Sequence, residues 1–129
     1  MAATLLHKLQ VKPGARLWLI DAPADLAAAM AAEGHARLVE GGPCDAVVAF
    51  CESPAEVAAN ASKAIAALPA DGLLWFGYRK GAAAKASGLS RDVGWAALSE
   101  LGYRGVRSIA FDDAWTGLRF REISRVKAG

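Results

Sequence analysis

Segments typical of strands and of helices alternate over most of this chain, and this alternation limits the fold more than any other feature. Strand patterns occupy residues 15–21, 36–40, 45–50 and 73–78, and helical patterns occupy residues 5–9, 23–33, 53–68 and 91–101. Such an order is typical of a parallel α/β sheet with helices on both faces. Two further strand patterns, at residues 104–111 and 116–123, flank "DDAW" and predict a C-terminal antiparallel hairpin. The sequence therefore predicts a three-layer α/β sandwich with a mostly parallel six-stranded sheet.

The order of the strands depends on one short connection. Only residues 41–44, "GGPC", separate the second strand from the third. Parallel neighbours need a crossover of about a dozen residues, so the two strands either pair antiparallel or lie on opposite sides of the first strand. The continuous apolar run at residues 45–50 is typical of a central strand. This favours the second alternative, which places the first strand between the second and the third.

Polar residues and prolines predict where the helices begin. Pro23 suits a first helical position because its missing N–H would be unpaired there. Ser53 and Glu56 have the spacing of a capping box. Ser90 is predicted to cap the helix at residues 91–101.

Length and composition indicate an ordinary globular protein of one domain, residues 1–129, with 54% hydrophobic and 22% charged residues. No apolar run reaches the roughly 18 residues of a membrane span, and the N-terminus is a poor signal peptide. We therefore expect a cytoplasmic protein that does not enter a membrane. The net charge is −2 over residues 1–70 and +4 over residues 71–129, so the second half is the basic one.

The two cysteines, Cys44 and Cys51, flank one strand pattern. Seven steps of about 3.3 Å place them roughly 23 Å apart, too far for a disulfide, and an odd spacing predicts opposite faces of the strand. With only His7 and His35 as histidines, they form no zinc pattern. We expect buried core thiols and no metal site.

Three segments resemble the class I methyltransferase-like Rossmann fold in a shortened form. "KPGARLWLID", at residues 12–21, resembles the first, cofactor-binding strand. "CDAVVAF" and "LPADGLLWFGYRKG", at residues 44–50 and 68–81, resemble two later strands of that fold. The resemblance covers most of the chain and implies a Rossmann-like sandwich with an antiparallel C-terminal hairpin and the strand order 2-1-3-4-6-5.

Four shorter motifs resemble a bacterial family known as domain of unknown function 3052. They are "KPG" at residues 12–14, "DAP" at 21–23, "SRD" at 90–92 and "DDAWTGLRFR" at 112–121. The last motif is the most distinctive. This resemblance implies no established activity, cofactor or catalytic residue.

The turn after the first strand lies where the resemblance implies a cofactor. Asp21 could accept hydrogen bonds from an ammonium group or could cap the following helix, and Glu40, at the end of the second strand, could accept from ribose hydroxyls. Pro23, however, has no N–H to donate, and Ala22 and Ala24 add Cβ atoms where such turns carry glycine. We interpret this turn mainly as a junction of the scaffold, with Asp21 and Glu40 as candidate cofactor ligands.

A basic loop follows the fourth strand and predicts a candidate anion site. Its members are Arg79, Lys80, Lys85, Ser90 and Arg91. A helix N-terminus with basic side chains attracts anions, and open α/β sheets bind ligands at the carboxyl ends of their strands. The alternative is a solvated loop without a ligand.

The C-terminal hairpin carries arginines and one aromatic residue on one face. Alternation places Leu118 and Phe120 on one side and Trp115, Arg119 and Arg121 on the other, and Arg107 is a candidate fourth member of that outer face. Such a face can pair phosphates. The commoner alternative is the polar side of an edge hairpin, with Arg119 paired to Asp112 or Asp113.

No serine or cysteine nucleophile with a histidine partner is visible, so no catalytic residue is predicted. The leading hypothesis is a non-catalytic binding or regulatory module with no cofactor. Its first alternative is an enzyme or sensor that binds S-adenosylmethionine or a nucleoside, and its second is a nucleic-acid-binding protein that uses the basic half. A protein partner stays possible, as does a monomer or a homodimer.

Overall fold

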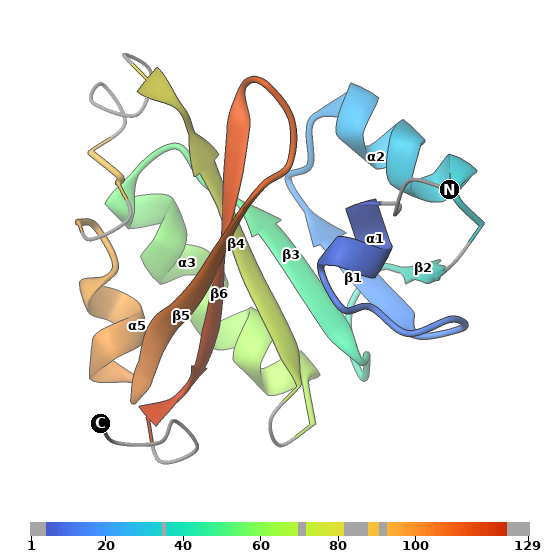
Figure 1. Ribbon diagram of the computed structural model, residues 1–129. Helices are drawn as coiled ribbons and strands as arrows, with labels where there is room; N and C mark the ends of the chain where they lie inside the picture. Colours follow the sequence, from blue (N-terminus) through green and yellow to red (C-terminus); the bar gives the residue numbers. More distant parts are fainter. Residues whose placement is uncertain (1–4, 35, 70–71, 82–87, 91–92, 124–129) are drawn as a thin grey trace.

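The protein is a three-layer α/β sandwich built on one six-stranded sheet with the strand order β2-β1-β3-β4-β6-β5 (Figure 1). The computed structural model describes residues 5–34, 36–69, 72–81, 88–90 and 93–123. Its helices are α1 (Leu5–Lys8), α2 (Ala24–Ala32), α3 (Pro54–Ala67) and α5 (Ala96–Glu100). Its strands are β1 (Arg16–Ile20), β2 (Arg37–Val39), β3 (Ala46–Phe50), β4 (Leu73–Arg79), β5 (Tyr103–Ala110) and β6 (Trp115–Glu122).

The predicted strand order is confirmed, including the crossing from β2 to β3. β1 pairs in parallel with β2 on one side and with β3 on the other, and β3 pairs in parallel with β4. β6 runs antiparallel to both of its neighbours, β4 on one side and β5 on the other, so β5 has the same direction as β4. β3 is buried at every residue, as its continuous apolar sequence predicts for a central strand.

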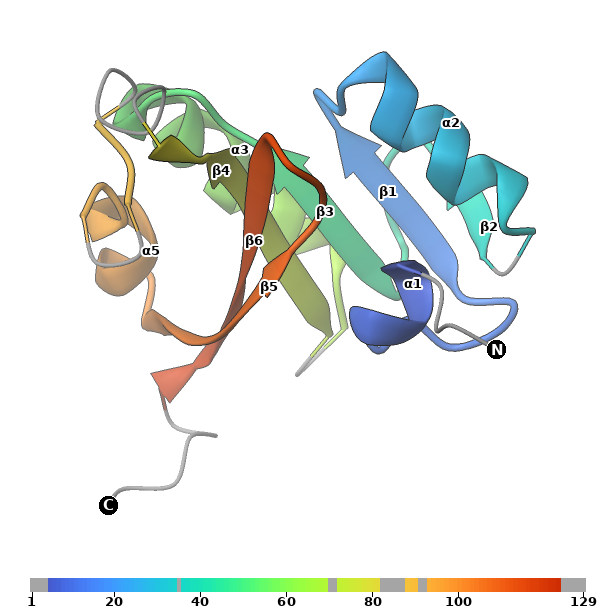
Figure 2. The ribbon, with the colours of Figure 1, turned by 45° about the horizontal axis from the view of Figure 1, so that its top comes forward.

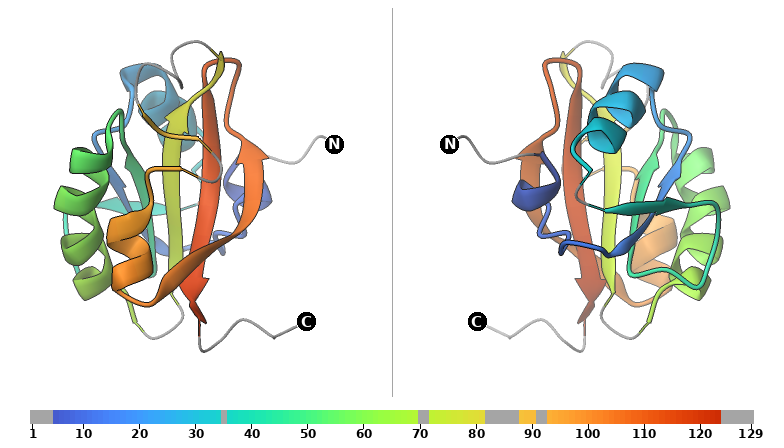
Figure 3. Two further views of the ribbon diagram at one scale, coloured as in Figure 1. Left: turned by 90° about the vertical axis from the view of Figure 1, so that its left-hand side faces the viewer. Right: turned by 90° about the vertical axis from the view of Figure 1, so that its right-hand side faces the viewer.

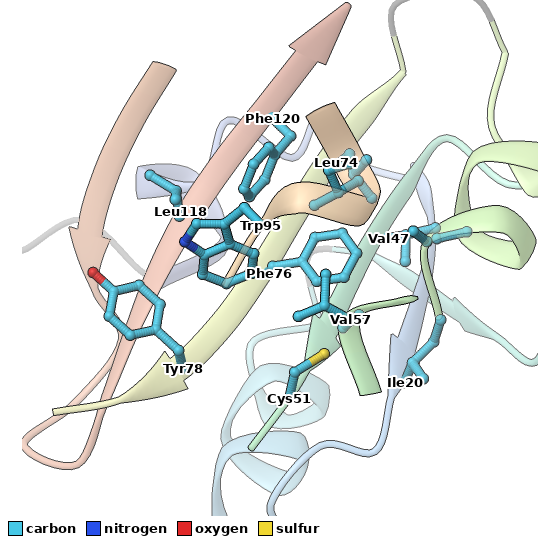
Figure 4. Close-up of a cluster of buried hydrophobic side chains, with 14 of the residues drawn as sticks. Ile20, Val47, Cys51, Val57, Leu74, Phe76, Tyr78, Trp95, Leu118 and Phe120 are labelled. Atoms are coloured by element: carbon cyan, nitrogen blue, oxygen red, sulfur yellow. The ribbon is translucent and has the colours of Figure 1, made fainter. Parts of the chain in front are cut away.

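Helices cover both faces of the sheet (Figures 2 and 3). On one face, α3 and α5 enclose a core that contains Phe76, Trp95 and Phe120, whose rings meet edge-on or tilted at centroid distances of 5.1–6.0 Å (Figure 4). Leu118 belongs to this core, so the predicted inner face of β6 is confirmed. Cys44 and Cys51 both belong to this core. The prediction of opposite faces is wrong because Cys44 precedes β3 and does not follow its alternation.

A second core, on the other face, joins α1 and α2 to the sheet. At its centre Gly77 of β4 lies directly opposite Gly117 of β6. A Cβ atom at Gly117 would collide with the ring of Phe111. The paired glycines therefore form a trough in the sheet, and Phe111 fills it while stacking against Phe50 at 5.5 Å.

α1 is tied to this face by hydrogen bonds as well as by packing. Leu6 and Leu9 are fully buried. The buried Trp75 indole of β4 donates to the backbone carbonyl of Leu9 over 3.1 Å, and the N–H of Leu6 donates to Glu33, which follows α2. The segment after α1 is therefore held beside β4 and its neighbour β6.

The predicted beginnings of two helices are wrong. Trp95, not Ser90, precedes α5, which begins only at Ala96. Gly94 has a positive φ of 100°, and a side chain there would collide with Leu89, so a left-handed turn interrupts the predicted helix. α2 begins at Ala24 after Pro23, with no side chain capping it. The capping box of Ser53 and Glu56 is confirmed, because Ser53 accepts from the Glu56 N–H at 3.1 Å.

The amino edge of β1 carries an ion pair that predicts a pH effect. Asp45 accepts hydrogen bonds from the backbone N–H and the Nε of Arg16, at 2.8 and 3.2 Å, and the Arg16 guanidinium lowers the pKa of this carboxyl. A lowered pKa stabilises the folded state above the unfolded pKa of about 3.9, and this stability is lost as the pH falls through the folded value. Asp45→Asn should therefore be less stable than the wild type at pH 7, with a difference that shrinks as the pH falls below the unfolded pKa of this carboxyl and through its lower folded value. Urea unfolding of both proteins at several pH values measures the difference in their free energies of unfolding. A difference that does not change with pH would contradict the prediction.

No helix among the described residues is long and apolar enough to cross a membrane.

Candidate functional site

The candidate site lies where the direction of the chain across the sheet reverses. β1 is flanked by β2 and β3, and the helices that follow β1 and β3 pack on opposite faces, α2 on one and α3 on the other. In open α/β sheets this arrangement leaves a crevice at the carboxyl ends of the two strands, where ligands bind. Asp21 directly follows β1, and Cys51 and Glu52 follow β3.

Asp21 has an unusual backbone at this edge. Its φ of 54° is left-handed, a conformation that glycine adopts freely and that aspartate and asparagine tolerate better than other residues. The alternative role as a helix cap is wrong, because no side chain caps α2. The Asp21 side chain is exposed, and its charge is one of the factors that raise the pKa of Cys51. Asp21 therefore lies near the end of β3 and keeps a turn geometry normally supplied by glycine.

Glu40 lies at the end of the neighbouring strand. β2 ends at Val39, which pairs with Trp18 of β1, and the exposed Glu40 follows. Asp21 and Glu40 thus stand at the carboxyl ends of two adjacent parallel strands. Two exposed carboxylates are suitable acceptors for an ammonium group and for ribose hydroxyls. Because Pro23 has no N–H to donate, the carboxylates of Asp21 and Glu40 are better suited than the turn backbone to bind a nucleoside cofactor that carries an ammonium group.

Arg79 stands at the end of β4 on the same edge, held by two partners. Its Nε lies 2.8 Å from an oxygen of Glu52, and its guanidinium carbon lies 4.3 Å from the centre of the Trp115 ring. Stacking on an indole and pairing with a carboxylate fix the position of the guanidinium. The sequence did not predict Glu52 or Trp115 as its partners. The N–H of Lys80 donates to the carbonyl of Ala114 and ties the end of β4 to the hairpin turn.

The rest of the predicted anion site is only partly described. The Ser90 N–H donates to the carbonyl of Val93, and its carbonyl accepts from the Trp95 indole at 2.6 Å. Because α5 begins at Ala96, Ser90 does not stand at a helix N-terminus. Lys85 and Arg91 lie outside the described residues.

Cys51 is not a candidate nucleophile, although it lies close to Asp21. Burial raises the pKa of its thiol to about 12, while its hydrogen bond with Asn60 acts in the opposite direction. A thiol with this pKa is protonated at neutral pH. Cys51 is therefore suited to packing, as predicted.

The C-terminal hairpin presents two different faces. Trp115 lies on the face opposite Leu118, as alternation predicts, but it is only 5% exposed and packs against Phe50 at 5.2 Å. Asp112 accepts hydrogen bonds from the N–H groups of Ala114 and Trp115, both at 2.8 Å, and so stabilises the turn. The predicted phosphate-binding face therefore has no exposed aromatic residue at Trp115.

No protein-family model matches the chain, and no curated protein matches it significantly. The more specific resemblance, to domain of unknown function 3052, therefore stays a prediction.

Solved structures do match the fold. The N-methyltransferase NodS from Bradyrhizobium japonicum WM9 aligns with a TM-score of 0.56 at 13% identity over 92% of each chain. The ribosomal protein L11 methylase from Lactobacillus delbrueckii subsp. bulgaricus aligns with a TM-score of 0.55 at 15% identity over 92% of this chain and 75% of its own. NodS in complex with S-adenosyl-L-homocysteine aligns with a TM-score of 0.52 at 14% identity over 91% of this chain and 83% of its own.

These matches correct two predictions. The leading hypothesis, a non-catalytic module, and the expectation of no cofactor are both contradicted, because the proteins that share this architecture are methyltransferases and one holds S-adenosyl-L-homocysteine. The turn does not need glycine for its shape, since Asp21 adopts the left-handed backbone there. The first alternative, a protein that binds S-adenosylmethionine or a nucleoside, agrees better with these findings. The chain has a methyltransferase-like Rossmann fold.

Proposed function

We propose that this chain binds S-adenosylmethionine at the carboxyl edge of β1 and β2 and acts as a methyltransferase. The observation that carries the proposal is the pair of exposed carboxylates, Asp21 and Glu40, at the ends of two neighbouring strands beside the point where the sheet reverses. The fold shared with NodS and with the L11 methylase supports it.

Each residue has a role that its chemistry suits. Asp21 would accept hydrogen bonds from the ammonium group of the cofactor, and Glu40 from its ribose hydroxyls. S-adenosylmethionine, when bound, supplies a methyl group activated by its sulfonium centre. Arg79, fixed by Glu52 and Trp115, would orient an acidic group of the acceptor substrate near the end of β4. The remaining predicted anion-site residues, Lys80, Lys85, Ser90 and Arg91, would extend this role.

Isothermal titration calorimetry with S-adenosylmethionine and S-adenosylhomocysteine tests the proposal. We expect saturable binding of both. Asp21→Ala should weaken binding of both by about tenfold or more, because each ligand carries the ammonium group and the charged hydrogen bond is lost. Glu40→Ala should weaken them to a similar degree through the ribose.

Glu100→Ala is the matched control, since Glu100 is an exposed carboxylate at the end of α5, outside this edge. It should leave both affinities unchanged. Absence of binding to the folded wild type, or equal losses in all three variants, would overturn the proposed site.

We also infer that the chain is a single domain and a member of domain of unknown function 3052. The distinctive order of residues 112–121 supports the membership. A bacterial origin is implied by the same resemblance, and the cytoplasmic location is expected from the N-terminal sequence; both stay predictions.

A further inference from the structure

A groove lies between the N-terminal segment and the C-terminal hairpin, on the face of the sheet opposite α3 and α5. Figure 3 shows α1 on this side, next to β5. The groove is open to solvent and has a volume of about 690 Å³. Its lining consists of His7, Lys8, Gln10, Val11, Lys12, Pro13 and Arg107. None of these described lining residues is acidic, and three of them, Lys8, Lys12 and Arg107, are cations.

The hairpin adds more positive charge to the same face. In the register of β5 and β6, Arg104 lies opposite Arg121 and Arg107 lies opposite Arg119. Directly paired residues of antiparallel strands project to the same side, and Arg119 and Arg121 share the side of Trp115, which belongs to the core beneath α1. Four arginines of this hairpin therefore project from the face that borders the groove.

The two arginine pairs of the hairpin bring like charges together on this face. Like charges directly opposite one another on a sheet repel. Gln10 accepts a hydrogen bond from Arg119 at 2.7 Å, which brings the N-terminal wall and the hairpin together at the groove. Two ion pairs are found among the described residues, Arg16 with Asp45 and Arg79 with Glu52. Neither pair includes Lys8, Lys12 or Arg107. A bound polyanion would relieve the repulsion.

We propose that this groove binds the phosphate backbone of a nucleic acid. Arg104 and Arg107 pair with residues two apart on β6, because β5 has a bulge between Gly105 and Arg107, so they are separated by about 7 Å at 3.3 Å per residue. Lys8 and Lys12 stand on the other wall, so the cations cover more than one phosphate group. A repeated anion can contact all of them, whereas a compact anion reaches only some. With Trp115 buried and no Phe, Tyr or Trp among the described lining residues, contacts to the backbone dominate, and binding depends little on base sequence.

The test uses the full chain and fluorescence anisotropy with a labelled 20-nucleotide oligouridine and a 20-base-pair RNA duplex. Binding to either probe should fall steeply with salt, with a slope of log affinity against log salt of about −0.7 per contacted phosphate for a single strand or −0.9 for a duplex. Lys12→Glu and Arg107→Glu should each weaken binding about tenfold or more at low salt and make the slope shallower by about one contact.

Lys63→Glu is the matched control. Lys63 is an exposed lysine of α3, on the opposite face of the sheet, and the substitution changes the net charge by the same amount. It should change affinity less than threefold or so, since only the long-range field is altered. Lys12→Gln should give an intermediate loss, and circular dichroism melting checks that all variants are folded.

Several outcomes would overturn this inference. They are no binding of either probe at low salt, losses with Lys63→Glu as large as those with Lys12→Glu, and displacement of oligouridine by inorganic tripolyphosphate at equal total phosphate. The inference is independent of the proposed function. Lys12→Glu should retain the wild-type affinity for S-adenosylhomocysteine, while Asp21→Ala should retain oligouridine binding, so each proposal can fail alone.

Discussion

Trp75→Ala should lower the free energy of unfolding by about 3–5 kcal/mol, the usual cost of removing a large aromatic side chain from a core. Trp75 is fully buried in the middle of β4, beneath α1. Its removal leaves a cavity between the sheet and α1, and it also deprives the Leu9 carbonyl of the indole donor. Urea denaturation followed by circular dichroism measures the effect.

Trp75→Phe separates the two contributions. Phenylalanine keeps much of the ring but cannot donate to Leu9, so the expected loss is only about 1–3 kcal/mol, the cost of an unpaired buried carbonyl together with a small cavity. Leu101→Ala is a control of another kind, because Leu101 is 48% exposed and its truncation should change stability by less than about 0.5 kcal/mol. If Trp75→Ala were as mild as Leu101→Ala, the packing of α1 on β4 would be refuted.

Gly117→Ala should destabilise the protein by about 1–3 kcal/mol, although alanine is ordinarily favoured over glycine within a strand by about 0.5–1 kcal/mol. The reason is that a Cβ atom at this position would occupy the space of the Phe111 ring. The sign of the change, measured by urea denaturation, therefore reports whether Phe111 fills the trough formed by Gly77 and Gly117.

A double-mutant cycle with Phe111→Leu provides the control. Leucine vacates part of the ring's volume, so Gly117→Ala should cost less in that background, with a coupling energy of about 1 kcal/mol between the two sites. Additive losses would show that the two residues do not compete for the same space and would contradict the described packing.

The sequence predicted the positions of some candidate site residues and not of others. The carboxyl ends of parallel strands share an edge, so the sequence could place Asp21, Glu40 and Arg79 at one border of the sheet once the strand order was predicted. The predicted anion site depended on a helix beginning after Ser90, and the left-handed Gly94 moved that beginning to Ala96. A glycine near a helix start is compatible with either outcome, because glycine adopts left-handed and right-handed backbone with similar ease and the sequence alone does not specify which.

Strand patterns, short connections and one continuous apolar strand were enough to place β1 between β2 and β3, because a connection of four residues cannot join parallel neighbours. The positions of β6 and β5 were predicted from the resemblance to the methyltransferase-like fold. Only the tertiary structure decided what surrounds each side chain. It gave Arg79 its partners Glu52 and Trp115, and it placed Lys8 and Lys12 across a groove from Arg107, some 95 residues away in the sequence. Local periodicity specifies which face of an element is apolar. It does not specify which distant segment covers that face, because that depends on how the shapes of side chains fit when the layers pack.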